Sequence, residues 1–214
     1  DGQDNIKDPV GMHGIRLEVD THIVTASTPS LRNLDSVLDK ARVMPSHRTV
    51  SSLASAEAVL NRQQKESGTL LLDIGAGTTN MVVVEDGEVQ HIAVIPVGGT
   101  NITNDLAIGL KTDLDIAEKL KITHASLQGD RPKGRINVEH EGRKHFFEAD
   151  EVHMITEARI EELLELVDKE LKKIGKSRKL PGGVVIVGGS AGLPGLAEFA
   201  REALQLPARL GHLM

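Results

Sequence analysis

The spacing of apolar residues changes several times along the chain, and each change marks a predicted element. Between residues 69 and 97, short β-branched runs are separated by Gly75–Gly77 and by Asp86–Gly87, a pattern typical of consecutive antiparallel hairpins. Helical spacing follows at 101–110 and 113–122. The pattern therefore predicts a hairpin sheet that continues into helices.

The longest helix is predicted at 151–174, where apolar residues recur every three or four positions. Asp150 and Glu151 near its start, and Lys172 and Lys173 near its end, agree with the helix dipole. The remaining predicted elements are two strands that flank Glu141–Gly142, a buried strand at 183–187, a helix at 193–203 with Pro194 in its first turn, and a strand that starts at 208.

The first part of the chain is expected to hold two strands and two helices. Apolar residues alternate in 14–26, which predicts a strand, and recur with helical spacing in 30–41. A short strand is expected at 47–52 and a helix at 54–61. Because strands and helices alternate along the chain, we expect an α/β fold.

The overall composition is that of an ordinary globular protein, with 39% hydrophobic and 26% charged residues among 214. The net charge of −6 argues against a nucleic-acid partner, which requires a basic face, and the chain has no Trp or Tyr to stack on bases. It also has no Cys, which excludes disulfides and a thiolate nucleophile. No apolar run approaches the ~20 residues that span a bilayer.

Candidate chemistry begins at the first hairpin turn, where Asp73 is followed by Gly75, Gly77, Thr78 and Thr79. Glycines let backbone N–H groups approach an anion closely, because no Cβ is in the way. Threonine hydroxyls add donors, and Asp73 can hold a hydrated Mg²⁺. The turn suggests a phosphate-binding loop, for which the alternative is an ordinary glycine-rich hairpin turn. A strand follows it, whereas Walker A loops and dinucleotide fingerprints open a helix.

A second glycine-rich turn, made of Gly188, Gly189 and Ser190, follows the next buried strand. Bare glycines at the carboxyl end of such a strand let adenine or ribose lie against the backbone. Between the two turns, Glu118 and Lys121 are three residues apart and share a helical face, where they can contact a nucleoside. The alternatives are a strand-to-helix turn without a ligand and a solvated surface ion pair.

Together these motifs resemble those of the FtsA family, the bacterial cell-division members of the actin-like ATPases. The sequence DIGAGTT at 73–79 is similar to the family's second phosphate motif, and AEKLK at 117–121 to its ribose- and adenine-contacting helix. GVVIVGGSAGLPGL at 183–196 is similar to its adenosine loop. The opening DGQDNIKDPVGMHGIRLE at 1–18 resembles the family's own inserted subdomain, called 1C.

The resemblance implies a partial actin-like (ribonuclease H-like) α/β fold with a remnant of subdomain 1C. Residues 1–48 would belong to 1C, an inter-subunit contact region, and 49–68 would return to the first actin-like domain. Residues 69–122 and 181–214 would form the ATP-binding domain, called 2A, and 123–180 would form subdomain 2B.

The resemblance also implies ATP and Mg²⁺ as cofactors. The residues expected to bind phosphate are Gly75, Gly77, Thr78 and Thr79, with Asp73 orienting Mg²⁺ through water, and those expected to hold the nucleoside are Glu118, Lys121, Gly188, Gly189 and Ser190. Asn80 stands where the family often has Asp, and Ala76 where it often has Gly. The family's first phosphate loop and C-terminal membrane helix have no counterpart in the sequence, so we expect at most a weak ATPase activity from this chain alone.

In the family, subdomain 2B captures the C-terminal tail of FtsZ, the tubulin-like ring protein. Arg143, Lys144 and Arg159 are expected to bind this acidic tail. The alternative for Arg159 is a pairing with Glu162 on a solvated helix face.

The function implied by the resemblance is that of a cytoplasmic scaffold at the inner face of the membrane at the division site. Such a scaffold binds ATP, polymerises like actin, contacts other divisome proteins through 1C, and links the FtsZ ring to the membrane through a segment outside this sequence. Two alternatives are a pilus-assembly adaptor of the same fold and a sugar-kinase-like enzyme. The kinase requires a general base near the γ-phosphate, for which the sequence shows no Asp motif.

Overall fold

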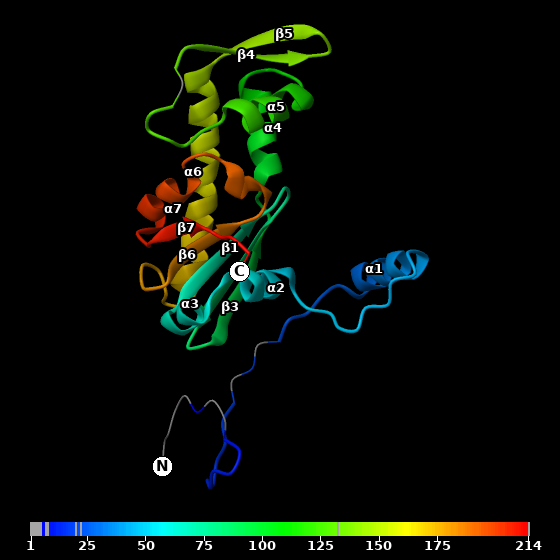
Figure 1. Cartoon of the computed structure of the whole chain (residues 1–214), viewed down its shortest axis with the longest axis vertical. Helices are drawn as coiled ribbons and strands as arrows, with labels where there is room; N and C mark the ends of the chain where they lie inside the picture. The colour runs from blue at the N-terminus through cyan, green and yellow to red at the C-terminus, as the bar shows by residue number, and fades with distance from the viewer. Residues whose placement is uncertain (1–5, 7–8, 20, 22, 132, 214) are drawn as a thin grey trace. The chain divides into compact units, whose positions relative to one another are not determined.

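The computed structural model describes residues 6, 9–19, 21, 23–131 and 133–213 of the chain (Figure 1). The chain divides into two compact units, with the boundary in the sequence between His47 and Arg48.

The first unit contains one described helix, α1 (Thr28–Lys40), close to the predicted helix at 30–41. None of its residues is buried. The strand predicted at 14–26 is wrong for the residues that the structure describes, which have no regular secondary structure. Ile15, Leu17 and Val19 are exposed there. An alternating pattern forms a strand only beside another strand that satisfies its backbone, and the described part of this unit contains none.

The second unit begins with two short helices. The short strand predicted at 47–52 is wrong, because helix α2 (Ser51–Val59) already begins within it and buries Ser52, Ala56 and Val59. Helix α3 (Arg62–Ser67) was not predicted. Its start is fixed by a capping box, in which Gln64 N–H donates to Asn61 Oδ1 over 2.9 Å and Asn61 N–H donates to Gln64 Oε1 over 3.0 Å.

The predicted hairpins form the antiparallel half of a five-stranded sheet. Its strands are β1 (Thr69–Ile74), β2 (Thr79–Glu85), β3 (Glu88–Ile95), β6 (Gly183–Val187) and β7 (Ala208–Leu210), in the order β3-β2-β1-β6-β7. Strand β6 pairs parallel with β1 and with β7. Since the carboxyl ends of parallel strands share one edge, the two glycine turns, which follow β1 and β6, are brought side by side.

Both faces of this sheet are covered. Leu70, Leu72 and Ile74 of β1 belong to the larger core, which includes helices α4 (Gly99–Gly109), α5 (Leu114–His124), α6 (Ala149–Lys173) and α7 (Leu196–Leu204). Leu71 faces the other way and packs in a smaller core with α2. The long α6, predicted at 151–174, begins beside a two-stranded hairpin of β4 (Arg135–His140) and β5 (Arg143–Glu148) and runs from there to the sheet (Figure 1).

The last helix begins later than predicted, and Pro194 lies outside it. A short 3₁₀ turn, η1 (Gly189–Gly192), follows β6, and α7 starts only after Gly195, whose φ is +83°. The carbonyl of Pro194 accepts a hydrogen bond of 2.8 Å from Leu127 N–H. This contact with the segment after α5 uses a residue that was expected to be helical.

Candidate nucleotide-binding site

The turn after β1 is braced by the start of α4. Gly99 N–H donates to the Gly75 carbonyl over 2.9 Å, and Thr100 N–H donates to the Ala76 carbonyl over 2.8 Å. A Cβ on Gly98 would lie only 2.5 Å from the Ala76 carbonyl oxygen. Glycine at position 98 therefore permits the close approach of α4 that holds the turn in shape.

Gly99, the first residue of α4, lies close to both glycine turns and to α5. Besides the bond to Gly75, the Gly99 carbonyl accepts a hydrogen bond of 3.1 Å from Lys121 Nζ. A Cβ on Gly99 would lie 2.6 Å from Ser190 Oγ, which itself donates to the Gly75 carbonyl over 3.4 Å. The first glycine turn, the second glycine turn and α5 are thus packed around the first residue of α4.

Lys121 and Glu118 form a partly buried network with Thr103 of α4. Lys121 Nζ donates to Glu118 Oε2 over 2.6 Å and to Thr103 Oγ1 over 2.9 Å, and the Thr103 hydroxyl also contacts Glu118. Burial opposes ionisation of Glu118, but the hydrogen bonds from Lys121 and Thr103 outweigh it and lower the pKa of Glu118. The Lys121–Glu118 ion pair foreseen as an alternative does form, with Lys121 only 17% exposed.

The sequence reading missed Thr103. The signal that could have found it is a polar residue next to Ile102 and close to Leu106, which mark the apolar face of the predicted helix. In the structure Thr103 lies on that buried face and is only 5% exposed. A buried hydroxyl needs a partner, and here it positions Lys121 and Glu118.

Asp73 lies in the middle of the sheet edge, between Asn80 of β2 and Val187 of β6. A Cβ on Gly188, whose φ is +93°, would lie 2.5 Å from Asp73 Oδ1. The carboxylate lines a cavity of about 310 Å³ that extends to Ser55 of α2. An oxygen ligand beside an open space at the end of β1 fits the expectation of a hydrated Mg²⁺.

The tips of both turns are open. A Cβ built on Gly77 or on Gly189 meets no atom within 4 Å, and Thr78 is exposed. Thr79 differs, because it is buried and its hydroxyl donates to the Val97 carbonyl over 2.8 Å. Gly77, Thr78 and Gly189 are therefore accessible to a ligand, whereas the Thr79 hydroxyl connects β2 to the segment before α4.

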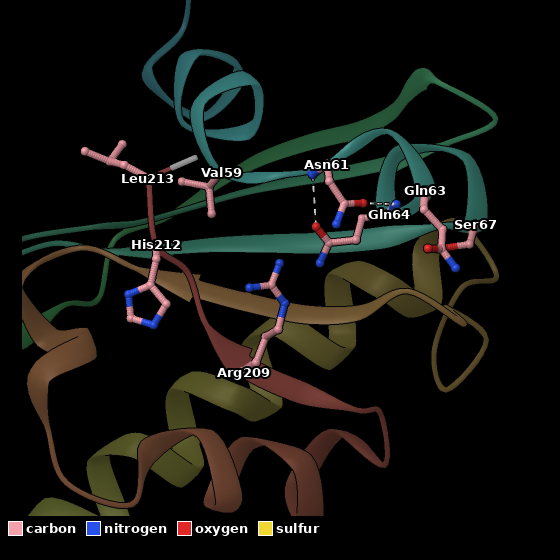
Figure 2. Close-up of a pocket in the computed structure, with 8 residues that line it drawn as sticks. All are labelled: Val59, Asn61, Gln63, Gln64, Ser67, Arg209, His212 and Leu213. Carbon is pink, nitrogen blue, oxygen red and sulfur yellow. Dashed lines mark hydrogen bonds between the residues drawn. The ribbon is translucent and has the colours of Figure 1, made fainter.

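A larger cavity, of about 510 Å³, shares Val59 and Leu213 with the cavity beside Asp73, but no residue of either glycine turn lines it (Figure 2). It is lined by residues of α3 and by Arg209 and His212 from the end of the chain. Asn61 and Gln64 point toward each other there, because they form the capping box of α3 (Figure 2). Since none of the predicted site residues lines it, its size does not make it the nucleotide site.

The residues expected to bind an acidic partner lie on two different elements. Arg143 and Lys144 are exposed at the start of β5. Arg159 of α6 is directed to α4, where its Nε and Nη2 lie 2.5 and 2.9 Å from the two carboxylate oxygens of Asp105. The alternative partner, Glu162, is also bound, at 2.5 Å from Nη1. The hydrogen bonds to Asp105 raise the pKa of Arg159.

No helix in the part of the chain that the structure describes is long and apolar enough to cross a membrane. No group of three or more His, Cys, Asp or Glu side chains is arranged there to hold a metal ion.

The sheet order, the two glycine turns at one edge and the covering helices define an actin-like ATPase fold, present in part. MreB5 of Spiroplasma citri bound to ADP superposes with a TM-score of 0.72 at 17% identity, over 87% of this chain and 61% of that one. A PilM–PilN type IV pilus biogenesis complex gives a TM-score of 0.63 at 19% identity, over 84% of this chain and 46% of that one. At such identities these likenesses establish the fold alone.

The chain belongs to the FtsA family. The family model described as cell division protein FtsA matches residues 70–214, and that of the SHS2 domain inserted in FtsA matches residues 1–25. FtsA of Bacillus subtilis is 37% identical over 98% of this chain and 48% of its own length. FtsA of Pseudomonas aeruginosa is 33% identical over 99% of this chain and 52% of its own length. The chain thus spans about half the length of the curated relatives it matches.

Proposed function

We propose that this chain is part of a bacterial cell-division scaffold that binds ATP and Mg²⁺, polymerises like actin and links the FtsZ ring to the cytoplasmic membrane at the division site. Membership of the FtsA family supports a role in cell division. The proposals of ATP binding, polymerisation and membrane linkage rest on the geometry of the candidate site and on the resemblance of its motifs to those of the family.

One observation carries the nucleotide proposal. Residues 75, 121 and 190 come from three separate parts of the chain. Gly75 and Lys121 are hydrogen-bonded to Gly99 at the first turn of α4, and Ser190 Oγ occupies the space that a Cβ on Gly99 would need. A ligand bound at this point would therefore contact segments that are already held together at Gly99. Solved structures of the same fold, MreB5 with ADP and with AMPPNP, carry nucleotide.

In this proposal the chain's own residues bind and orient the nucleotide. Backbone N–H groups at Gly77 and Thr78 bind phosphate, and Gly75 shapes the turn, because its own N–H donates to the Thr78 carbonyl over 2.9 Å. The Asp73 carboxylate holds a hydrated Mg²⁺, which offsets phosphate charge. Gly188, Gly189 and Ser190 bind the nucleoside together with Glu118 and Lys121. Thr79 supports the shape of the loop, since its hydroxyl donates to the Val97 carbonyl and its backbone is paired with β1 and β3.

In the same proposal, different parts of the chain have different roles. Residues 1–48 form part of the inter-subunit subdomain 1C, through which other divisome proteins bind, and 49–68 return to the first domain. Residues 69–122 and 181–214 bind the nucleotide. Residues 123–180 bind the FtsZ tail.

A calorimetric titration of this chain with MgATP tests the nucleotide site. We expect saturable binding that depends on Mg²⁺ and weakens about tenfold or more in Asp73→Ala, since a carboxylate that offsets phosphate charge is lost. Thermal unfolding of the variant serves as the control for folding. Equal affinity in Asp73→Ala would remove Asp73 from the site, and no binding by the folded wild-type chain would contradict a formed half-site.

A binding assay with a synthetic FtsZ C-terminal tail tests the partner assignment. We expect Arg159→Glu to weaken binding about tenfold, because it removes a cation and adds a repelling carboxylate. Lys169→Glu on the same helix makes the same change of charge and serves as the matched control. An unchanged dissociation constant in Arg159→Glu, or equal losses in the two variants, would sink the assignment of Arg159.

A further inference from the structure

The hairpin of β4 and β5 has one covered edge and one open edge. In an antiparallel pair, every second residue turns its N–H and C=O away from the neighbouring strand. The carbonyls of Asn137 and Glu139 turn away from β5, because they lie 3.2 Å from His124 Nε2 and 3.1 Å from Lys119 Nζ, both on α5. The outer edge of β4 is thus occupied by α5.

The register of the hairpin then identifies the outward-facing residues of β5. Asn137 pairs with Phe146, Glu139 with Lys144, and Arg135 with Glu148. Since paired residues face the same way, the backbone groups of Lys144, Phe146 and Glu148 turn away from β4. The carbonyl of Glu148 is an exception, because Glu148 is the N-cap residue of α6 and its carbonyl accepts the first hydrogen bond of that helix. Among the described strands β5 pairs only with β4, and it lies on the outer side of the hairpin (Figure 1).

Two of the features that prevent strand pairing, a bulge and a Pro, are absent from this edge, although β5 is short and carries Lys144. The pairing of β4 with β5 is regular and contains no bulge, and β5 contains no Pro. Phe146 is 49% exposed on its outer face, with the Arg135 guanidinium 4.6 Å from its ring centre. A regular edge with an exposed aromatic residue is suited to accept another strand.

The residues on this edge are complementary to themselves. If a second β5 runs antiparallel with Phe146 opposite Phe146, Lys144 of each copy stands opposite Glu148 of the other. All three pairs then join residues whose N–H groups face outward, and the carbonyls of Lys144 and Phe146 can accept from the second copy, whereas the Glu148 carbonyl remains bonded within α6. One row of side chains would then cross all four strands. It contains Glu139 and Lys144 of the first copy, followed by Glu148 and Arg135 of the second, and its charges alternate in sign.

We propose that β5 pairs with β5 of a second copy of this chain about a two-fold axis at Phe146, which gives a four-stranded sheet of order β4-β5-β5-β4. This contact is closed, because each copy uses the same surface, whereas an actin-like polymer needs two different surfaces. It is independent of nucleotide. Only a short strand is involved, so the contact is weak in solution and is populated when copies are held close together.

Cysteine cross-linking tests this contact without interference from other self-association. The chain has no Cys, so Phe146→Cys introduces a single thiol. Hydrogen-bonded antiparallel partners have Cα atoms about 5.5 Å apart, which is within disulfide range. Asn137→Cys is the matched control on β4, because its two copies would be three strand spacings apart, roughly 14 Å.

We expect mild oxidation of the nucleotide-free chain to give disulfide-linked dimers with Phe146→Cys and few with Asn137→Cys. Equal cross-linking at the two positions would show random collision and overturn the proposal. No cross-linking at position 146 would also overturn it and would leave the edge for a strand of another protein.

A charge exchange tests the register. Lys144→Glu alone and Glu148→Lys alone each place like charges opposite each other twice per dimer, so each should dimerise about tenfold more weakly in analytical ultracentrifugation. An equimolar mixture of the two variants restores opposite charges at both pairs and should recover the dimer. Circular dichroism checks that each variant folds. If the mixture associates no better than either variant alone, the two-fold register is wrong.

Discussion

At the scale of single residues, identical residue types in the two turns have different tasks. Gly98 and Gly188 are required by close approach, since a Cβ on either would lie 2.5 Å from an oxygen atom of the first turn or of Asp73. Gly77 and Gly189 face open space. The first pair maintains the shape of the site, and the second pair leaves room for a ligand.

A pair of alanine substitutions separates these tasks. Gly188→Ala should cost about 1–3 kcal/mol of unfolding free energy, because its φ is +93° and the new Cβ would collide with Asp73 and the Ile74 carbonyl. Gly189→Ala should stay within about 0.5 kcal/mol of wild type and yet lower MgATP affinity. Urea unfolding and calorimetry measure the two effects. A Gly189→Ala variant as unstable as Gly188→Ala would contradict this division.

At the scale of elements, α4 connects the candidate nucleotide site to Arg159 of α6. Its first residue, Gly99, contacts both glycine turns, and one turn later Thr103 orients Lys121 and Glu118. Asp105 on the same helix binds Arg159 of α6 through two hydrogen bonds. Helix α4 is therefore hydrogen-bonded to side chains of both α5 and α6.

The strength of the α4–α6 connection can be measured with a double-mutant cycle. Asp105→Ala and Arg159→Ala, alone and together, should give a coupling energy of about 1 kcal/mol in urea unfolding, since the pair is bidentate but still about a quarter exposed. Glu162→Ala is the control and should couple more weakly to Arg159, because the Glu162 side chain is 54% exposed. Additive effects of Asp105→Ala and Arg159→Ala would show that the contact adds nothing to stability.

At the scale of the whole molecule, the two units differ in how much they bury. Every buried residue of the two hydrophobic cores lies at or beyond Ala56, whereas α1 buries none. Apolar burial is the main source of folding free energy. The stability of the described structure therefore comes from the second unit.

Deletion of residues 1–47 should leave the second unit folded. We expect residues 48–214 to unfold within about 2 °C of the full chain, because no core residue is removed. Calorimetric scans of the two proteins compare them directly, and the enthalpy of unfolding should also agree. A fall of ten degrees or more would mean that residues 1–47 stabilise the second unit.

Local patterns predicted most elements of the second unit, and the errors have identifiable causes. Asp86 and Gly87 take positive φ values of 56° and 77° in the turn between β2 and β3, as expected for Asp-Gly. The helix α3 was missed because six residues are too few to show a hydrophobic period, although its capping box was present in the sequence. The start of α7 was placed too early because Pro194 fits a first helical turn equally well.

The sequence by itself determined the hairpins, the long helix, the two glycine turns and the family resemblance, because each depends on residues that are close together in the chain. The tertiary structure decided which of these residues meet. The parallel pairing of β1 with β6 brings Gly75 and Ser190 to Gly99, and α6 packing against α4 commits Arg159 to Asp105. Because both hydroxyls are buried, that of Thr79 is hydrogen-bonded to the Val97 carbonyl and that of Thr103 accepts from Lys121, which it positions. Such contacts depend on the packing of distant segments, which local spacing does not encode.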